Sequence, residues 1–260
     1  MSGCDLNGLG VLVTRPAGQA GPLAASIRQM RGKPTFFPGV VIEAVEHGRL
    51  VSALSSMTPM DLAIFVSPTA ARLGVPPLIE KFGSLDGLRV AAVGRTTAAE
   101  LEKLGLTDII VPDSSSGGEA LAGCLQLGQL ANRKVLLVRG EGGNDVLETA
   151  LRKRGANVWL FECYRRCLPG ADFGAVEPLL RDGRIGAWMA TSGEILDNLL
   201  RLAGEHAALL RNTPLFVNHP QVAVRAFSQA VKVIFVTSGG DAGLSAGLCT
   251  WFCEPRASMS

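Results

Sequence analysis

Of the 260 residues of the chain, 47% are hydrophobic and 18% are charged, so a disordered or fibrous protein is excluded. This length fits one large domain or two small ones. Its 25 Lys and Arg nearly balance its 23 Asp and Glu, and the formal net charge of +2 disfavours a nucleic-acid coat or an electrostatic membrane binder. No apolar run approaches the ~20 residues of a membrane span and no secretory signal is visible, so we expect a cytoplasmic protein.

Short apolar runs rich in β-branched residues alternate with longer segments of helical period. This alternation is typical of parallel α/β units. The runs predicted to be strands are 9–14, 33–37, 61–67, 89–93, 108–111, 134–138, 157–161, 185–191, 214–217 and 232–236. The best-defined helices are predicted at 19–30, 97–104, 145–154 and 221–230.

The second five predicted strands repeat the first five at a nearly constant offset. Val13 corresponds to Leu137, a shift of 124 residues, and Ser67 corresponds to Ser192, a shift of 125. Such internal similarity indicates a duplicated structural unit. We therefore predict two similar five-stranded α/β units.

Polar and small residues recur where the predicted strands end. Ligands of open parallel sheets bind beyond the carboxyl ends of the strands, where helix N-termini supply unpaired N–H groups. The residues at these ends predict an anion-binding cleft, and they are Arg15, Ser67, Gly94, Thr97, Arg139, Thr191 and Ser192. For Thr14, Ser67, Thr97 and Ser192 taken singly, a plain helix N-cap without a ligand is the favoured alternative.

The six cysteines, at positions 4, 124, 163, 167, 249 and 253, and the three scattered histidines have no spacing typical of a metal site. We expect reduced thiols, no disulfide scaffold and no metal. Cys163 and Cys167 are four residues apart and could share a helical face, but a redox pair is disfavoured there.

Two motif-like strings are interpreted as chance. Residues 139–143 (RGEGG) lack the GKS or GKT ending of a phosphate loop, and the GxSxG string at 243–247 has no His after it. Flavin binding gains no support because aromatic residues make up only 5% of the chain. Asn144 and Asp145 are predicted to cap the following helix, and 113–119 to form a surface loop.

Tyr164 is the only tyrosine, and it follows a predicted strand beside Arg165 and Arg166. Its phenol could donate a proton or a hydrogen bond, and the guanidinium groups could bind carboxylates. The alternative, favoured by the residues alone, is a tyrosine packed at a domain junction with its hydroxyl in water.

Several segments in a fixed order resemble the uroporphyrinogen-III synthase family. They are 11–17 (VLVTRPA), 65–68 (FVSP), 93–98 (VGRTTA), 135–140 (VLLVRG), 155–158 (GANV), 164–166 (YRR) and 191–193 (TSG). The order and spacing of these segments, which are distributed over most of the chain, carry the resemblance. It implies two flavodoxin-like parallel-sheet domains joined by two linker strands, one inserted into the other. Residues 1–37 with 167–260 would form the first domain, 42–162 the second, and 38–41 with 163–166 the linkers.

The same resemblance implies a lyase of heme biosynthesis that cyclises hydroxymethylbilane to uroporphyrinogen III. Water is lost and ring D is inverted, by positioning in an interdomain cleft and without a metal or redox cofactor. Tyr164 would be the catalytic acid, and the substrate-binding residues would be Arg15, Ser67, Gly94, Thr97, Arg139, Arg165, Thr191 and Ser192. A monomer is implied, with hydroxymethylbilane synthase as a candidate partner. The alternative, motivated by Asn144, Gln221 and the atypical tail at 248–260, is a non-catalytic tetrapyrrole-binding module.

Overall fold

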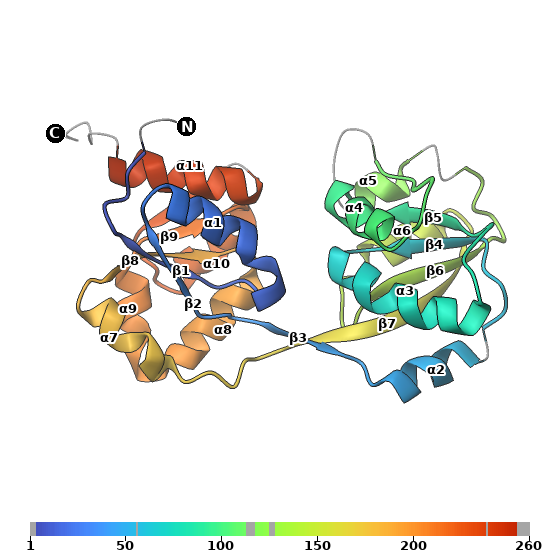
Figure 1. Cartoon of the computed structure of the whole chain (residues 1–260), viewed down its shortest axis with the longest axis horizontal. Coiled ribbons are helices and arrows are strands. Elements are labelled where there is room, and N and C mark those ends of the chain that lie inside the picture. Colours follow the sequence, from blue (N-terminus) through green and yellow to red (C-terminus); the bar gives the residue numbers. More distant parts are fainter. Residues whose placement is uncertain (1–3, 56, 113–117, 125–127, 238, 254–260) are drawn as a thin grey trace. The chain divides into compact units, whose positions relative to one another are not determined.

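The chain folds into two α/β units, each built around its own parallel sheet (Figure 1). A computed structural model describes residues 4–55, 57–112, 118–124, 128–237 and 239–253. The first unit runs to Val41 and resumes at Cys167, and the second unit is Ile42–Arg166. The predicted α/β class with two parallel sheets is confirmed.

The sheet of the first unit has the order β10-β9-β8-β1-β2. Its strands are β1 (Gly10–Val13), β2 (Lys33–Phe36), β8 (Ile185–Ala190), β9 (Leu215–Val217) and β10 (Ile234–Val236). Its helices are α1 (Gly21–Gln29), α7 (Glu177–Arg181), α8 (Gly193–Ala203), α9 (Ala207–Asn212), α10 (Pro220–Ser228) and α11 (Gly240–Cys253). Short 3₁₀ turns lie at Ala17–Gln19, Phe173–Ala175 and Gly204–His206.

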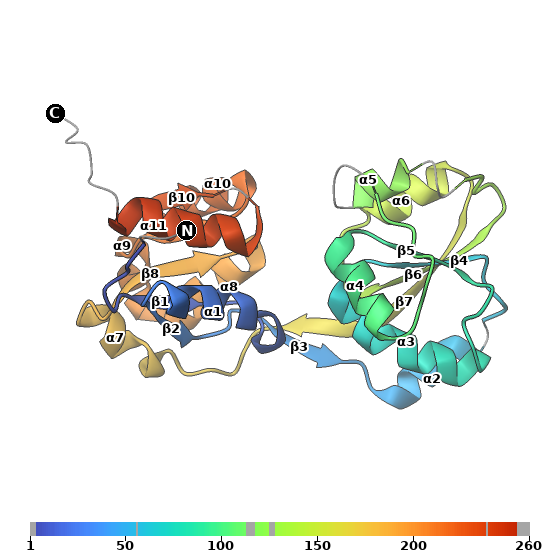
Figure 2. The same ribbon diagram turned by 45° about the horizontal axis from the view of Figure 1, so that its top comes forward.

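Helices cover both faces of this sheet (Figure 2). Leu23 and Ile27 of α1 and Leu244 of α11 pack in one core cluster with Val11 and Val13 of β1. Helices α8 and α10 lie on the opposite face. Because neither face meets water, β1 and β9 are buried along their whole length, which explains their uninterrupted apolar sequences.

The sheet of the second unit has the order β3-β7-β6-β4-β5. Its strands are β3 (Val41–Ala44), β4 (Leu62–Phe65), β5 (Arg89–Ala92), β6 (Lys134–Gly140) and β7 (Asn157–Cys167). Its helices are α2 (His47–Ser55), α3 (Pro68–Phe82), α4 (Arg95–Lys103), α5 (Gly118–Ala122) and α6 (Val146–Lys153). Helices α2, α3 and α4 contribute to the core on one face, and α5 and α6 to the core on the other.

The two sheets share one topology, as the sequence repeat predicts. The order β2-β1-β8-β9-β10 of the first sheet corresponds to the order β7-β6-β4-β5 of the second. In the second unit a single bridge between Ala91 and Ile110 takes the place of β10. The prediction of a full strand at 108–111 was therefore wrong, because Asp108 adopts a left-handed φ of 52° and only Ile110 pairs with β5. Strand β3 was not predicted, and it occupies the other edge of this sheet.

Several local predictions are corrected by the tertiary structure. Cys163 and Cys167 lie on β7, not on a helix, so they share no helical face. The assignment of 163–166 as a linker strand stays a prediction, and these residues lie on β7. Cys4 and Cys249 form a disulfide, contrary to the expectation of reduced thiols, because the fold brings residues 245 positions apart together. No helix in the described part of the chain has the length and hydropathy of a membrane span.

The capping predictions are confirmed for two of four residues. Ser67 and Ser192 accept hydrogen bonds from the N–H groups of Ala70 and Ile195 and so cap α3 and α8. Thr97 lies inside α4, whose N-cap is Gly94, and the Thr14 hydroxyl instead donates to a strand carbonyl. The predicted loop at 113–119 falls mainly on 113–117, outside the described residues.

Candidate functional site

A pocket of about 370 Å³ opens at the carboxyl ends of β4 and β6, where the strand order of the second sheet reverses direction. Such a switch point is where ligands of flavodoxin-like sheets bind. The lining residues come from the strand ends and the loops that follow, and they are Val66, Ser67, Val93, Gly118, Leu137, Arg139, Gly140, Gly143, Asn144, Leu147, Tyr164 and Arg166. Of the predicted site residues, the fold thus brings Ser67, Arg139 and Tyr164 together here.

The phenol of Tyr164 is hydrogen-bonded to the hydroxyl of Ser67, with 3.1 Å between the two oxygens. Tyr164 is packed, with 5% of its surface exposed, and its hydroxyl is bonded to Ser67 at the pocket wall. The Ser67 oxygen also accepts the Ala70 N–H at 3.0 Å, which fixes it at the start of α3. Either hydroxyl can be the donor in the Ser67–Tyr164 bond.

A β-bulge turns Tyr164 toward the pocket. Arg139 pairs with Glu162 and Gly140 with Tyr164, so Cys163 is the extra residue on β7. The bulge interrupts the alternation of buried and exposed residues and buries both Cys163 and Tyr164. Burial raises the pKa of the Cys163 thiol to about 12 and keeps it protonated at neutral pH.

Gly140 leaves the room that the Tyr164 ring occupies. A Cβ atom at position 140 would lie 2.5 Å from Cε2 and 2.7 Å from Cζ of the ring, closer than any ordinary contact. Sequence reasoning did not single out Gly140 for this role, because the requirement comes from a strand partner 24 residues away (164 minus 140).

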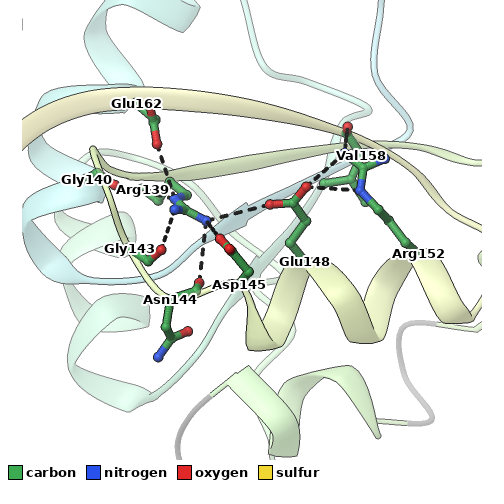
Figure 3. A network of polar contacts seen from close by, with 9 residues as sticks. All are labelled: Arg139, Gly140, Gly143, Asn144, Asp145, Glu148, Arg152, Val158 and Glu162. Atoms are coloured by element: carbon green, nitrogen blue, oxygen red, sulfur yellow. Dashed lines mark hydrogen bonds and ion pairs between the residues drawn. The ribbon is translucent and has the colours of Figure 1, made fainter.

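Arg139 is the centre of an internal ion-pair network (Figure 3). Its guanidinium lies 3.3 Å from a carboxylate oxygen of Asp145, 3.7 Å from Glu148 and 3.5 Å from Glu162, and it donates to the carbonyl oxygen of Gly143 at 2.5 Å. The side chain is only 6% exposed. Substrate binding by Arg139 stays a prediction, and in this structure its guanidinium pairs with three carboxylates of its own chain.

The network also determines how α6 begins. Asp145 is the N-cap residue, as predicted, yet its side chain makes no capping hydrogen bond and pairs with Arg139 instead. Arg139 donates to the carbonyls of Gly143 and Asn144, so it ties the loop between β6 and α6 to the end of β6. We infer that Arg139 shapes the pocket wall and does not present a free positive charge.

The other predicted residues of this unit lie outside the pocket lining. Gly94 is the N-cap of α4 and follows the lining residue Val93, and Thr97 is buried in the first turn of that helix. Arg165 points away from the buried face and pairs with Glu43 at 3.2 Å.

The first unit carries a corresponding pocket of about 410 Å³ at the ends of β8 and β9. It is lined by Thr191, Ser192, Gly193, Asn218, His219, Gln221, Val222 and Arg225. Thr191 and Ser192, which were predicted as site residues, therefore both line this pocket.

Asn218 and Arg225 line this pocket, whereas Arg15 is not among its lining residues. Asn218 Oδ1 is buried and has no hydrogen-bond partner among the described residues, a feature that only the tertiary structure reveals. Arg225 is held by Asp197, and this hydrogen bond raises the pKa of the guanidinium. Arg15, the remaining predicted residue, forms an ion pair with Asp241 at the start of α11. Within the ranges that the structure describes, no cluster of three or more His, Cys, Asp or Glu side chains could hold a metal.

Comparisons with known proteins agree on one family. The model of the family described as uroporphyrinogen-III synthase HemD matches residues 21–241. A uroporphyrinogen-III synthase from Salmonella typhimurium is 32% identical over 204 residues, covering 75% of this chain and 80% of the relative. A second, from Escherichia coli, is 29% identical over 197 residues, with coverage of 75% and 80%.

Solved structures show the same fold. A mutant uroporphyrinogen III synthase from the extremely thermophilic bacterium Thermus thermophilus aligns with a TM-score of 0.60 at 19% identity, over 92% of this chain and 96% of that one. The corresponding enzyme from Helicobacter pylori gives a TM-score of 0.58 at 13% identity, over 92% and 97%.

Proposed function

The chain belongs to the uroporphyrinogen-III synthase family, and we propose that its reaction depends on the hydrogen-bonded pair of Tyr164 and Ser67 in the second unit. The activity is the cyclisation of hydroxymethylbilane to uroporphyrinogen III with loss of water and inversion of ring D. The relatives are named as synthases, which favours an enzyme over the non-catalytic tetrapyrrole-binding module. The observation that carries the residue assignment is the partly buried 3.1 Å contact between the two hydroxyls at the switch point.

Tyr164 would act as the general acid for departure of the substrate hydroxyl. The phenolic proton passes to the hydroxyl oxygen, the carbon–oxygen bond breaks and water leaves. The phenolate that remains accepts a hydrogen bond from Ser67. Because Ser67 also accepts the Ala70 N–H, its single proton is free to point at Tyr164. The positive end of α3 adds to the stabilisation of the phenolate.

Stereochemical control would come from holding one geometry of the chain. The substrate also closes without an enzyme, to the unflipped isomer, so the protein must favour one of two competing barriers. Each ~1.4 kcal/mol between these barriers gives tenfold selectivity. Two pockets at switch points support binding of a flexible polyanion by backbone N–H groups and hydroxyls.

The individual substrate contacts remain predictions. Thr191 and Ser192 are supported by their place on the pocket wall of the first unit. The assignments of the remaining residues rest on the sequence resemblance, and they are Arg15, Gly94, Thr97, Arg139 and Arg165. The three arginines among them are ion-paired within the chain.

The test measures turnover of hydroxymethylbilane and separates the products by isomer. Tyr164→Phe should lower kcat for the type III product by roughly 10²- to 10⁴-fold, the usual contribution of a general acid. The missing flux should appear as type I product, formed in solution. A Tyr164→Phe protein with wild-type kcat would remove Tyr164 from the mechanism, and type I product alone from the wild type would support the non-catalytic module.

Ser67 needs a control because it also caps α3. Ser67→Ala removes both the phenol contact and the cap, which costs about 1 kcal/mol of stability. Ser67→Thr keeps a hydroxyl and is expected to restore kcat. If Ser67→Ala is as active as Ser67→Thr, the hydroxyl plays no part in the reaction.

Three broader assignments from the sequence belong to the same proposal. A monomer is proposed from the sequence resemblance, and a cytoplasmic location from the sequence composition. Hydroxymethylbilane synthase is a candidate partner because its product closes spontaneously and direct transfer would limit this loss. Size-exclusion chromatography of the protein alone and with that enzyme tests the oligomeric state and the partnership.

A further inference from the structure

Three cysteine sulfurs lie together where the beginning of the chain meets its last helix. Cys4 is disulfide-bonded to Cys249, and the thiol sulfur of Cys253 lies 3.4 Å from the Cys4 sulfur. Cys249 and Cys253 are one helical turn apart on α11, so they face the same segment. A third thiol in contact with a disulfide is the arrangement that thiol–disulfide exchange requires.

The Cys253 thiol contacts the Cys4 sulfur of the disulfide. The Cys249 sulfur is flanked by the thioether sulfur of Met30 at 3.2 Å, while the Cys4 sulfur faces Cys253. The Cys253 thiol also donates a hydrogen bond to the carbonyl oxygen of Asp5 at 3.2 Å, which holds it beside Cys4. Cys4, Cys249 and Cys253 are all partly exposed, so base and small thiols can reach them.

We propose that Cys4, Cys249 and Cys253 form an exchange site in which the disulfide moves between two positions on α11. The Cys253 thiolate attacks the Cys4 sulfur, the Cys4–Cys249 bond breaks, and Cys249 leaves as a thiolate. The number of disulfides and the number of thiols are unchanged, so the step needs no external oxidant or reductant. The proton lost by Cys253 passes to solvent and is regained by Cys249.

The consequence is a disulfide cross-link whose attachment on α11 can shift by one helical turn. Cys4 precedes β1, and its neighbour Leu6 is buried in the same core cluster as Leu244 and Leu248 of α11. In its first position the disulfide joins Cys4 to Cys249, and in its second position it joins Cys4 to Cys253. Both keep the start of the chain fastened to the last helix, and a low-molecular-weight thiol entering the same exchange would release it.

The site is tested by mapping disulfides in oxidised wild-type protein. The protein is incubated across neutral to mildly alkaline pH, quenched with acid, alkylated and digested with chymotrypsin, which cleaves after Trp251 and Phe252 and so separates Cys249 from Cys253. Both the Cys4–Cys249 and the Cys4–Cys253 peptides are expected. The second should form faster as the pH rises, because the thiolate is the attacking species.

Two variants make the assignment specific. Cys249→Ser, oxidised with glutathione disulfide, should give the Cys4–Cys253 bond, and Cys253→Ser should retain only Cys4–Cys249. Cys124 is a free thiol remote from the site in sequence and serves as the alkylation reference. The proposal is overturned if the wild type shows only the Cys4–Cys249 peptide at every pH, or if Cys4 in Cys249→Ser stays fully alkylated.

Discussion

Replacing Gly140 by alanine should displace the Tyr164 ring and slow the reaction without unfolding the protein. The new Cβ atom would lie 2.5 Å from the ring, whereas carbon atoms in contact are normally about 3.5 Å apart or more. The ring must therefore move by roughly 1 Å. The hydrogen bond to Ser67, now 3.1 Å, would lengthen toward about 4 Å and be lost.

A displacement of this size is expected to cost up to about 100-fold in kcat, which corresponds to ~2.7 kcal/mol of the activation free energy. Overpacking should also lower the free energy of unfolding of the second unit by about 1–3 kcal/mol. The assay is kcat for the type III isomer, with urea unfolding followed in parallel. Gly48→Ala is the matched control, because position 48 is exposed on α2 and only a flexible Glu46 side chain lies within 4 Å.

A double-mutant cycle separates an effect through Tyr164 from a general disturbance. If Gly140→Ala acts by moving the phenol, its effect on kcat should largely disappear in the Tyr164→Phe background. Wild-type kcat in the folded Gly140→Ala protein, or a full-sized loss in both backgrounds, would refute the reasoning.

Three further predictions concern stability. Arg139→Met should lower the free energy of unfolding of the second unit by about 1–3 kcal/mol in urea titrations, since it removes the hydrogen bonds from a buried guanidinium to the Gly143 and Asn144 carbonyls and its pairing with partly exposed carboxylates. An unchanged free energy of unfolding would contradict the network. The free energy of unfolding of the second unit should fall as pH rises from 9 toward 12, because the folded state keeps the Cys163 proton that the unfolded state releases. The Cys163→Ala variant should show a shallower fall. Equal slopes for the two proteins would count against this role of Cys163. Reduction with dithiothreitol should destabilise the first unit by about 2–4 kcal/mol through loss of the Cys4–Cys249 bond, leaving the second unit unchanged as the internal control.

Much of the candidate site could be predicted because its residues follow directly from strand ends. Ser67, Thr191 and Ser192 were located by the rule that parallel strands present their carboxyl ends to ligands, and all three line pockets there. The roles of Arg139 and Arg15 could not be read in this way. Whether an arginine is free or ion-paired depends on carboxylates such as Glu162 and Asp241, which only the folded chain brings near.

The sequence by itself determined the α/β class, nine of the ten predicted strands and the duplicated plan, because apolar periodicity and turn residues are local properties. Tertiary structure alone decided the bulge at Cys163, the space that Gly140 leaves for Tyr164, and the disulfide of Cys4. Each of these depends on the register or approach of segments distant in the chain, and no local pattern encodes such a distance.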